Sequence, residues 1–377
     1  MSNTFKEDEL LFPLLQYSLF GKYPDISLYK GCTSEQYNKI LADTVGDGTY
    51  SLIAWALLSI SEEINLPISI KLNCALHIEQ AKKIYYRISS AAVKISERLA
   101  KLEVKMMIIK GLSISALYPI PHLREFGDID MYLFGKYATF DKLMESEGIK
   151  VTNKKNKHSN LYYEGVSIEN HKYFGNIDIY KTDRSLQTIL DKLVKSVEEK
   201  PSYLKIENHS DPCSIIVPSA DFNALFLIRH STVHLIAGNM PLRHLCDWAI
   251  FLKNGRNGLH EEVIKSYLHD LGLEKAAGAF CYIAIKYMGL NKEYSLYENY
   301  EEYADFASEI LLLIEEAREF NKKPVPKSIG LLLYYKWKRL MRQKYPYELI
   351  HGKGFWHEKF LHSIIAHLKH PAFILAK

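Results

Sequence analysis

Apolar residues in the first quarter of the chain recur at helical spacing. Residues 5–20 and 34–62 carry apolar pairs three or four positions apart, and residues 76–102 form a longer stripe separated by Lys, Arg and Glu. Such spacing gathers the apolar side chains on one face of a helix, which is then buried. The pattern predicts an N-terminal helical layer over residues 1–100.

Strand patterns replace the helical ones in the next part of the chain. Residues 104–109 are a short apolar run, and residues 128–131 alternate acidic and apolar positions. Residues 161–174 alternate in the manner of a β-hairpin, with Glu164-Gly165 at the turn. Strands interleaved with helices indicate an α/β or α+β core, which we place at residues 101–215.

Helical spacing returns at residue 219 and predicts a helical domain over residues 216–325. Its expected helices cover residues 220–235, 242–253, 259–271, 275–287 and 300–320. Pro324 and Pro326 then interrupt the pattern, and residues 326–377 form a basic, aromatic segment that is predicted to be helical. The whole chain is therefore predicted to be α+β, with helical regions on both sides of the core.

Composition indicates a soluble globular protein. The chain has 377 residues, of which 47% are hydrophobic, and no apolar run approaches the roughly 18 residues that a membrane span needs. The five cysteines are an odd number and include no CxxC pair, as is usual in a reducing compartment. These features predict a cytoplasmic location and no transmembrane segment.

Charge is distributed unevenly along the chain. Residues 331–377 hold nine Lys or Arg against Glu348 and Glu358, a net charge of +7, so the remainder carries −3 within the overall +4. Most of the protein is therefore not expected to bind a polyanion. The basic segment allows nucleic acid as a partner, but a solvated basic face is the commoner outcome.

Asp128 and Asp130 are the first candidates for chemistry. Alternation along a strand points both carboxylates to one face and Ile129 and Met131 to the other. Two carboxylates on one face repel each other unless a cation lies between their oxygens, and hard oxygen ligands suit Mg²⁺, with Mn²⁺ as an alternative. An exposed strand face or a Ca²⁺ loop is the competing interpretation of an isolated Asp-x-Asp.

Two further acids could complete such a site. Glu169 and Asp178 both lie on predicted strands, and a third carboxylate beside the pair would allow two metal ions to bind. We favour Glu169, because its strand alternates more cleanly and places His171 on the same face. Ahead of the acids, the apolar run ends in Lys110-Gly111 before a short helix, an arrangement that can cradle phosphate.

Three other pairs in the C-terminal half are assigned structural roles. His230 and His234 share a helix face at a spacing that can bind zinc, but no third ligand accompanies them in the sequence, so packing at the domain junction is expected. Arg243 and Asp247 are predicted to form an ion pair on a helix surface. Trp337 and Trp356 are expected in the core, with stacking on bases or sugars as the alternative.

Five short motifs together resemble a known family. In chain order they read IKG at 109–111, REFGDID at 124–130, ENH at 169–171, HSTVH at 230–234 and RHLCD at 243–247. The order is similar to that of an uncharacterised bacterial nucleotidyltransferase family of the DNA polymerase β superfamily, over roughly residues 5–255. The turn departs from the superfamily, because Gly111 is followed by Leu112-Ser113 instead of Gly or Ser.

The resemblance implies a fold and a reaction. The core would be the small mixed sheet of polymerase-β-like nucleotidyltransferases. The enzyme would be Mg²⁺-dependent and would transfer a nucleoside monophosphate from a nucleoside triphosphate to a hydroxyl acceptor that the sequence does not identify, with release of pyrophosphate. The alternatives are a catalytically silent protein that binds a nucleotide or a partner, and a toxin-like transferase that acts on RNA or protein.

The resemblance also implies residue roles. Asp128, Asp130 and Glu169 would be catalytic metal ligands, and Glu169 would help to activate the acceptor hydroxyl. Gly111 and Ser113 would form the phosphate-facing turn. Lys110 and Arg124 would offset phosphate charge; without substrate, Arg124 is expected to pair with the two aspartates, and a solvent-exposed lysine is the alternative for Lys110.

Overall fold

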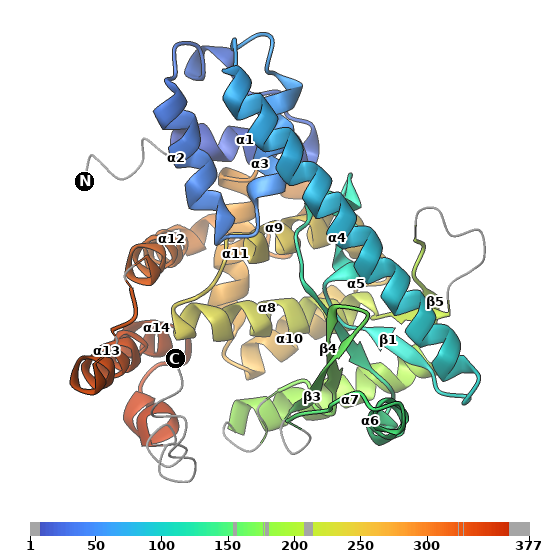
Figure 1. Ribbon diagram of the computed structural model, residues 1–377. Coiled ribbons are helices and arrows are strands. Elements are labelled where there is room, and N and C mark those ends of the chain that lie inside the picture. The colour runs from blue at the N-terminus through green and yellow to red at the C-terminus, as the bar shows by residue number, and fades with distance from the viewer. Residues whose placement is uncertain are drawn as a thin grey trace.

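The computed structural model of the protein describes residues 8–153, 157–175, 177, 181–206, 214–322, 324–326 and 328–361. The chain combines a mixed six-stranded sheet with many flanking helices, so the predicted α+β class is confirmed (Figure 1). Among the described residues, no helix combines the length and apolar character needed to cross a membrane.

Four helices form the N-terminal layer, as predicted: α1 (Asp8–Phe20), α2 (Ser34–Val45), α3 (Tyr50–Ser59) and α4 (Ile68–Ala100). The predicted helical stretch at 34–62 is divided into α2 and α3 where Gly48 has a positive φ of 64°. A capping box between Thr33 and Gln36 starts α2. Helix α4 begins eight residues before the predicted stripe, and it reaches from this layer to the sheet (Figure 1).

The sheet has the strand order β3-β4-β2-β1-β6-β5. Its strands are β1 (Met106–Ile108), β2 (Asp128–Tyr132), β3 (His158–Tyr163), β4 (Val166–His171), β5 (Ser202–Tyr203) and β6 (Ile215–Val217). Strands β3 and β4 form the predicted hairpin, with Glu164 and Gly165 both at positive φ in the turn. Strand β2 runs parallel to β4 and antiparallel to β1, which places the acidic strand in the interior of the sheet.

The two faces of the sheet pack against different helices. Ile129 and Met131 of β2 belong to an apolar cluster shared with α4 and α6 (Tyr137–Ser146). Tyr132 belongs to a second, larger cluster that includes α7 (Lys181–Glu199) and the C-terminal helices. The carboxylates of β2 lie on the same face as Tyr132, so they point toward this second layer.

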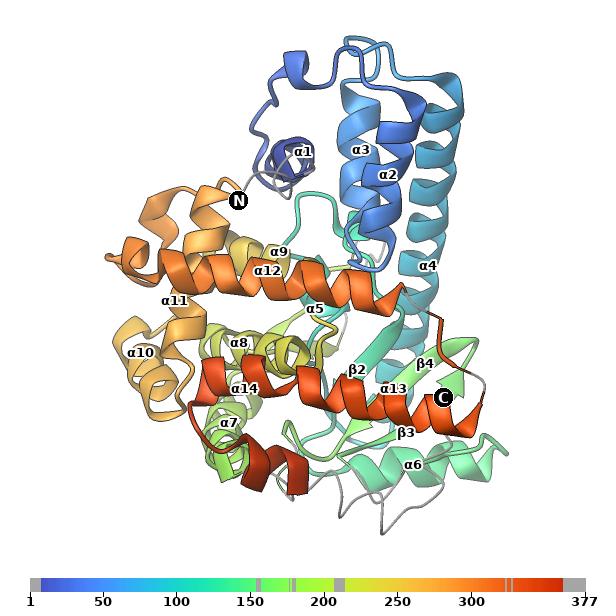
Figure 2. The ribbon, with the colours of Figure 1, turned by 90° about the vertical axis from the view of Figure 1, so that its left-hand side faces the viewer.

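In the described residues, the C-terminal layer contains the five helices predicted for residues 216–325, the helix α13 that was predicted in the basic segment, and α14. Their bounds are α8 (Ala220–Ala237), α9 (Arg243–Ile250), α10 (Glu261–Asp270), α11 (Glu274–Lys286), α12 (Ala304–Asn321), α13 (Ile329–Arg342) and α14 (Lys344–His351). Figure 2 shows α12 and α13 along their length. This layer shares one apolar cluster with α1 and α3, so helices from both ends of the chain pack together. The domain boundaries drawn from the sequence stay a prediction.

Short elements complete the fold. They are α5 (Leu112–Ser115), the 3₁₀ turns at Ile26–Leu28, Pro121–Leu123, Lys292–Tyr294 and Tyr300–Tyr303, and π-helical turns at Phe251–Gly255 and Trp356–Phe360. Helix α7 and strands β5 and β6 were not predicted. In α7 the buried residues Leu186, Leu190 and Val194 are four apart, a helical pattern that the sequence does contain.

The tryptophans of the C-terminal segment are not in the core, contrary to the expectation from sequence. Trp337 and Trp356 are 50% and 48% exposed. For Trp337 the reason is the position of α13, an outer helix in which Leu332 is the buried residue among those described.

Gly278 in α11 is expected to be essential for packing. A Cβ atom at this position would lie 2.5 Å from the ring of Tyr303. We predict that Gly278→Ala lowers the free energy of unfolding by about 1–3 kcal/mol, because overpacking outweighs the gain of up to about 1 kcal/mol in helix propensity. Chemical denaturation measures the change. Gly330→Ala in α13 is the matched control, since a Cβ there meets nothing within 4 Å, and it should leave stability unchanged or slightly raised.

Candidate active site

Three carboxylates converge on one face of the sheet. In the parallel β2–β4 pair, Asp130 is opposite Glu169 and Asp128 is opposite Ser167. Because side chains alternate along each strand, Asp128, Asp130 and Glu169 share the face that points toward the C-terminal helices. The structure therefore brings together the three predicted metal ligands. Asp178, the other candidate for third carboxylate, lies outside the described residues.

Asp130 is at the centre of this group. Its Oδ1 accepts a hydrogen bond from Nε2 of His171 at 2.9 Å and lies 3.2 Å from Nζ of Lys110. Its Oδ2 is buried without a hydrogen-bond partner within the described part of the chain. The Oε2 atom of Glu169 lies 3.5 Å from Nε2 of both His158 and His171, so His171 bridges the acids of β2 and β4.

The carboxylates of β2 have opposite pKa shifts. Burial raises the pKa of Asp130, but the charge of Lys110 and the hydrogen bond from His171 outweigh burial and hold this pKa below its usual range. Burial and then repulsion from Asp130 raise the pKa of Asp128, and Lys110 offsets this only in part.

Lys110 points into the carboxylate group, and its side chain is 21% exposed. Burial lowers the pKa of its ammonium, but attraction from Asp130, Asp128 and Glu169 raises the pKa above the ordinary value. A solvent-exposed lysine, the alternative interpretation, does not describe this environment. In the absence of a metal ion, Lys110 supplies the positive charge that this face of the sheet requires.

The turn after Lys110 packs directly against the acidic strand. Gly111 has a φ of 58°, and a Cβ atom there would lie 3.4 Å from the Phe126 ring and 3.5 Å from the carbonyl oxygen of Asp128. The Oγ of Ser113 donates to the Lys110 carbonyl oxygen at 3.4 Å. The turn and β2 therefore form one continuous surface beside the carboxylates, where the sequence predicted a phosphate cradle.

Contrary to the expectation from sequence, Arg124 pairs with Asp247 and not with Asp128 and Asp130. Its Nε and Nη2 donate to Oδ1 and Oδ2 of Asp247 on α9, at 2.8 and 2.7 Å. Tyr118 donates to the same carboxylate at 2.7 Å. Arg124 and Asp247 are 4% and 2% exposed, so this ion pair is buried. It holds the loop before β2 against the helical layer, and the role of Arg124 toward phosphate stays a prediction.

The predicted surface ion pair between Arg243 and Asp247 is also wrong. Arg243 and Asp247 do lie one turn apart on a helix, as the spacing predicted. Asp247 is on the buried side of α9, however, and there it pairs with Arg124. Arg243 instead donates from Nη1 to the Glu125 carbonyl oxygen at 2.5 Å. Its guanidinium also lies 2.9 Å from the position that a Cβ on Gly48 would occupy.

Glu125 is a site-forming residue that the sequence analysis missed. Its Oε1 accepts hydrogen bonds from the backbone nitrogen and the hydroxyl of Ser51, at 2.8 and 2.7 Å, and contacts Nε2 of His77 at 3.0 Å. These contacts connect the loop before β2 to α3 and α4. Beside this loop is a cavity of about 350 Å³. Its lining includes Tyr85, Arg124, Phe126, Gly127 and Arg243.

Three histidines gather on the helical layer that faces the acids. His230 and His234 of α8 are joined by His244 of α9, whose place beside them the sequence analysis did not foresee. Burial, followed by nearby positive charges that include Lys110, lowers the pKa of each imidazole. Lys110 therefore lies close enough to act electrostatically on both the carboxylates and the histidines.

The carboxylate group has the donor chemistry of a divalent cation site. Asp130, Glu169 and His171 offer ligand atoms within 4.8 Å of one another. The unpartnered Oδ2 of Asp130 and the raised pKa of Asp128 both indicate that a positive charge is needed here. Hard carboxylate oxygens are the ligands that Mg²⁺ prefers, so the residues present fit this ion.

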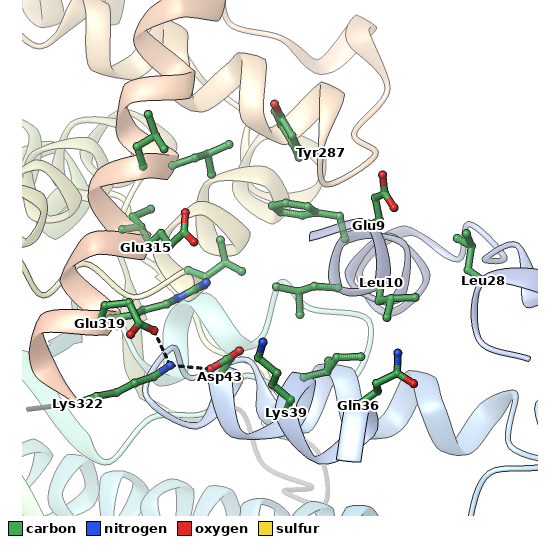
Figure 3. A pocket seen from close by; sticks show the side chains of 18 of the residues that line it. Glu9, Leu10, Leu28, Gln36, Lys39, Asp43, Tyr287, Glu315, Glu319 and Lys322 are labelled. Carbon is green, nitrogen blue, oxygen red and sulfur yellow. Dashed lines mark hydrogen bonds and ion pairs between the residues drawn. The ribbon is translucent and has the colours of Figure 1, made fainter. Parts of the chain in front are cut away.

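A second cavity lies away from the carboxylates. It measures about 900 Å³ and is enclosed by α1, α2 and α12 (Figure 3). Lys322 closes one side through ion pairs with Asp43 and Glu319. None of the acids described above lines it. Its size therefore does not mark it as the place of chemistry, which is better indicated by the clustered titratable groups.

Comparison with known protein families identifies the family of this chain. A model described as an uncharacterised nucleotidyltransferase matches residues 55–289, which is more than half of the chain. The protein belongs to this nucleotidyltransferase family. The matched range contains the three carboxylates, Lys110 and the three histidines. Comparisons with curated proteins and with solved structures gave no match.

Membership establishes this nucleotidyltransferase as a transferase that acts on a nucleotide. It confirms the family that the five motifs suggested. The match carries no information on individual residues, so the roles of Asp128, Asp130, Glu169 and the Lys110-Gly111 turn stay predictions, supported by the way in which the fold brings them together.

The buried ion pair between Arg124, in the loop before β2, and Asp247 of α9 is expected to dominate the stability of this site. We predict that Asp247→Ala lowers the free energy of unfolding by about 3–5 kcal/mol, because Arg124 is left buried without a countercharge. Chemical denaturation measures the loss. Glu262→Ala, which removes the exposed partner of Lys265, is the control and should change stability by less than about 1 kcal/mol. Equal effects in both variants would contradict the prediction.

Asp128 is expected to destabilise the metal-free fold at neutral pH. Its folded-state pKa lies above the unfolded value, so stability is greatest below the unfolded pKa and is lost as pH rises through the folded pKa. We predict that Asp128→Asn raises the melting temperature at pH 7 in the presence of a chelator. The gain should shrink as the pH falls and Asp128 becomes protonated. A gain that is independent of pH would contradict this account.

Proposed function

We propose that this nucleotidyltransferase transfers a nucleoside monophosphate from a nucleoside triphosphate to an acceptor hydroxyl and releases pyrophosphate. The main support is the convergence of Asp128, Asp130 and Glu169 on one face of adjacent parallel strands, beside the Lys110-Gly111 turn. Phosphoryl-group transfer depends chiefly on positioning and on neutralisation of phosphate charge, and clustered carboxylates hold the metal ions that do this.

The three carboxylates would hold Mg²⁺, or Mn²⁺ in its place. When bound, the ion would neutralise charge on the α-phosphate and on the leaving pyrophosphate. Asp130 would then no longer need Lys110 as its main countercharge. The ammonium of Lys110, whose side chain leaves the chain directly before Gly111 of the turn, would be free to contact a phosphate oxygen of the substrate.

Glu169 would accept the proton of the acceptor. Its side chain is 25% exposed, so a hydroxyl group can reach it, and His158 and His171 hold its Oε2 from two sides. The acceptor oxygen forms a bond to the α-phosphorus while the bond to the bridging oxygen of the β-phosphate breaks. Pyrophosphate leaves with that electron pair, and the hydroxyl proton passes to Glu169.

The smaller cavity provides room for part of a substrate. It begins at Gly127, directly before Asp128, and carries the aromatic rings of Tyr85 and Phe126 together with Arg124 and Arg243. Aromatic rings stack on nucleobases, and guanidinium groups bind anionic or carbonyl oxygens. The cavity therefore suits a nucleoside or a polar acceptor whose reactive oxygen lies beside the carboxylates.

Substitution of the third carboxylate tests the proposed function. We predict that Glu169→Gln lowers pyrophosphate release by about 10²–10⁴-fold, because the variant loses both a metal ligand and a proton acceptor. Release is measured with each nucleoside triphosphate, with Mg²⁺ or Mn²⁺, and with cell extract as the source of acceptor. Glu164→Gln, in the exposed turn of the same hairpin, is the matched control and should retain full activity.

Two outcomes would contradict the proposal. Loss of turnover in Asp178→Asn together with unchanged turnover in Glu169→Gln would show that Asp178 is the third carboxylate. Binding of a nucleoside triphosphate without pyrophosphate release from any donor, acceptor fraction and metal would indicate a catalytically silent binding protein.

A further inference from the structure

The three histidines of the helical layer have the arrangement of metal ligands. His230 and His234 are four residues apart on α8 and therefore share one face, while His244 is contributed by the next helix, α9. One ring nitrogen from each lies within 4.8 Å of the others. Their ring centroids are 4.6, 4.9 and 5.0 Å apart.

These separations fit a single bound ion. A tetrahedral metal ion with bonds of about 2.1 Å to three imidazole nitrogens holds the ring centres roughly 5 Å apart. The rings of His230, His234 and His244 already have nearly this spacing, so binding would require only small side-chain rotations.

Neighbouring groups orient the rings. The Nδ1–H of His234 donates to Oδ1 of Asn239 at 3.1 Å, which leaves Nε2 with a lone pair for a metal. The ring of His230 is stacked on Phe226. His244 is 6% exposed, and its Nδ1 has no hydrogen-bond partner among the residues that the structure describes. An unsatisfied buried nitrogen is costly, and a metal ion or its bound water would remove that cost.

The cluster lies on the side of the sheet that carries the acids. Along α8, aromatic rings follow at intervals of four residues from Phe222 through Phe226 to His230, and Phe222 packs on Phe174, which in turn packs on Tyr132 of β2. Tyr132 and Asp130 share one face of their strand. The histidines share no residue with the Asp130, Glu169 and His171 group, so the two clusters are separate sites in one region.

We propose that His230, His234 and His244 bind a Zn²⁺ ion, with a fourth coordination position left for water or a substrate oxygen. Three nitrogen ligands select zinc over Mg²⁺, which prefers oxygen. The positive charge of Lys110 opposes a cation here, so the three imidazole ligands have to offset it. This site does not depend on the proposed nucleotidyl-transfer reaction, and it could position substrate or fix α9 against α8.

Metal content of the full-length protein tests the proposal. The protein is equilibrated with Zn²⁺ in excess Mg²⁺, and bound zinc is measured by mass spectrometry. We expect His234→Ala to lose one zinc ion per chain relative to the unmodified protein, since His234 is partly exposed and its loss should not unfold the chain. His269→Ala, an exposed histidine on α10, is the matched control and should keep the full zinc content. Thermal unfolding verifies the fold of each variant.

Two further measurements distinguish this site from the carboxylates. Co²⁺ in place of Zn²⁺ should give the strong visible absorption of tetrahedral coordination, retained in Asp130→Asn and lost in His234→Ala and in His244→Gln. Asn239→Ala should weaken zinc binding by about 10–100-fold, because the orienting hydrogen bond is removed. The proposal is overturned if the unmodified protein binds no zinc, or if Asp130→Asn loses the ion while both histidine variants retain it.

Discussion

Electrostatic repulsion among three neighbouring carboxylates, of which Asp130 is buried, is the constraint around which the site is built. Asp128, Asp130 and Glu169 point to one face of two central strands, where their charges cannot all be solvated. Lys110 and His171 stabilise the ionised form of Asp130, whereas burial and repulsion from Asp130 raise the pKa of Asp128. A fold that retains such an arrangement at a cost in stability is typical of a functional centre that gains its missing positive charge from ions and substrate.

The helical layers give this centre its shape. The Arg124–Asp247 ion pair joins the loop before β2 to α9, and Glu125 joins the same loop to α3 and α4. One short segment is therefore held from both sides, directly before the acidic strand begins. Rigid positioning of this kind matters because a shift of about 1 Å in a reacting group can lower a rate by about 10²-fold.

The sheet and the helical layer that faces it offer different ligands. The sheet contributes oxygen ligands, while α8 and α9 contribute imidazole nitrogens from His230, His234 and His244. Lys110 interacts electrostatically with both groups, because the carboxylates raise its pKa and its charge lowers the pKa of His230. The two proposed sites would therefore take ions of different preference, hard cations on the carboxylates and borderline cations on the histidines.

Local patterns in the sequence determined much of this protein. Two-residue alternation placed Asp128 and Asp130 on one face, the Glu164-Gly165 turn set the hairpin register that presents Glu169, and helical spacing located most of the helices. These features depend on neighbours along the chain, so they can be recognised before folding is known. The order of the motifs was sufficient to indicate the family that the comparison confirmed.

Only the tertiary structure decided which distant residues meet. Arg243 lies one helical turn from Asp247, yet Asp247 pairs with Arg124, which is 123 positions away in sequence. The reason is that α9 is buried on the side of Asp247, where Arg124 is the cation that packs against it. Glu125 and His244 look ordinary in sequence, and they acquire roles only when α3, α4 and α8 pack beside them. Spacing along the chain indicates on which face of a helix or strand a side chain lies. Which distant residues contact that face depends on how the helices and strands pack together.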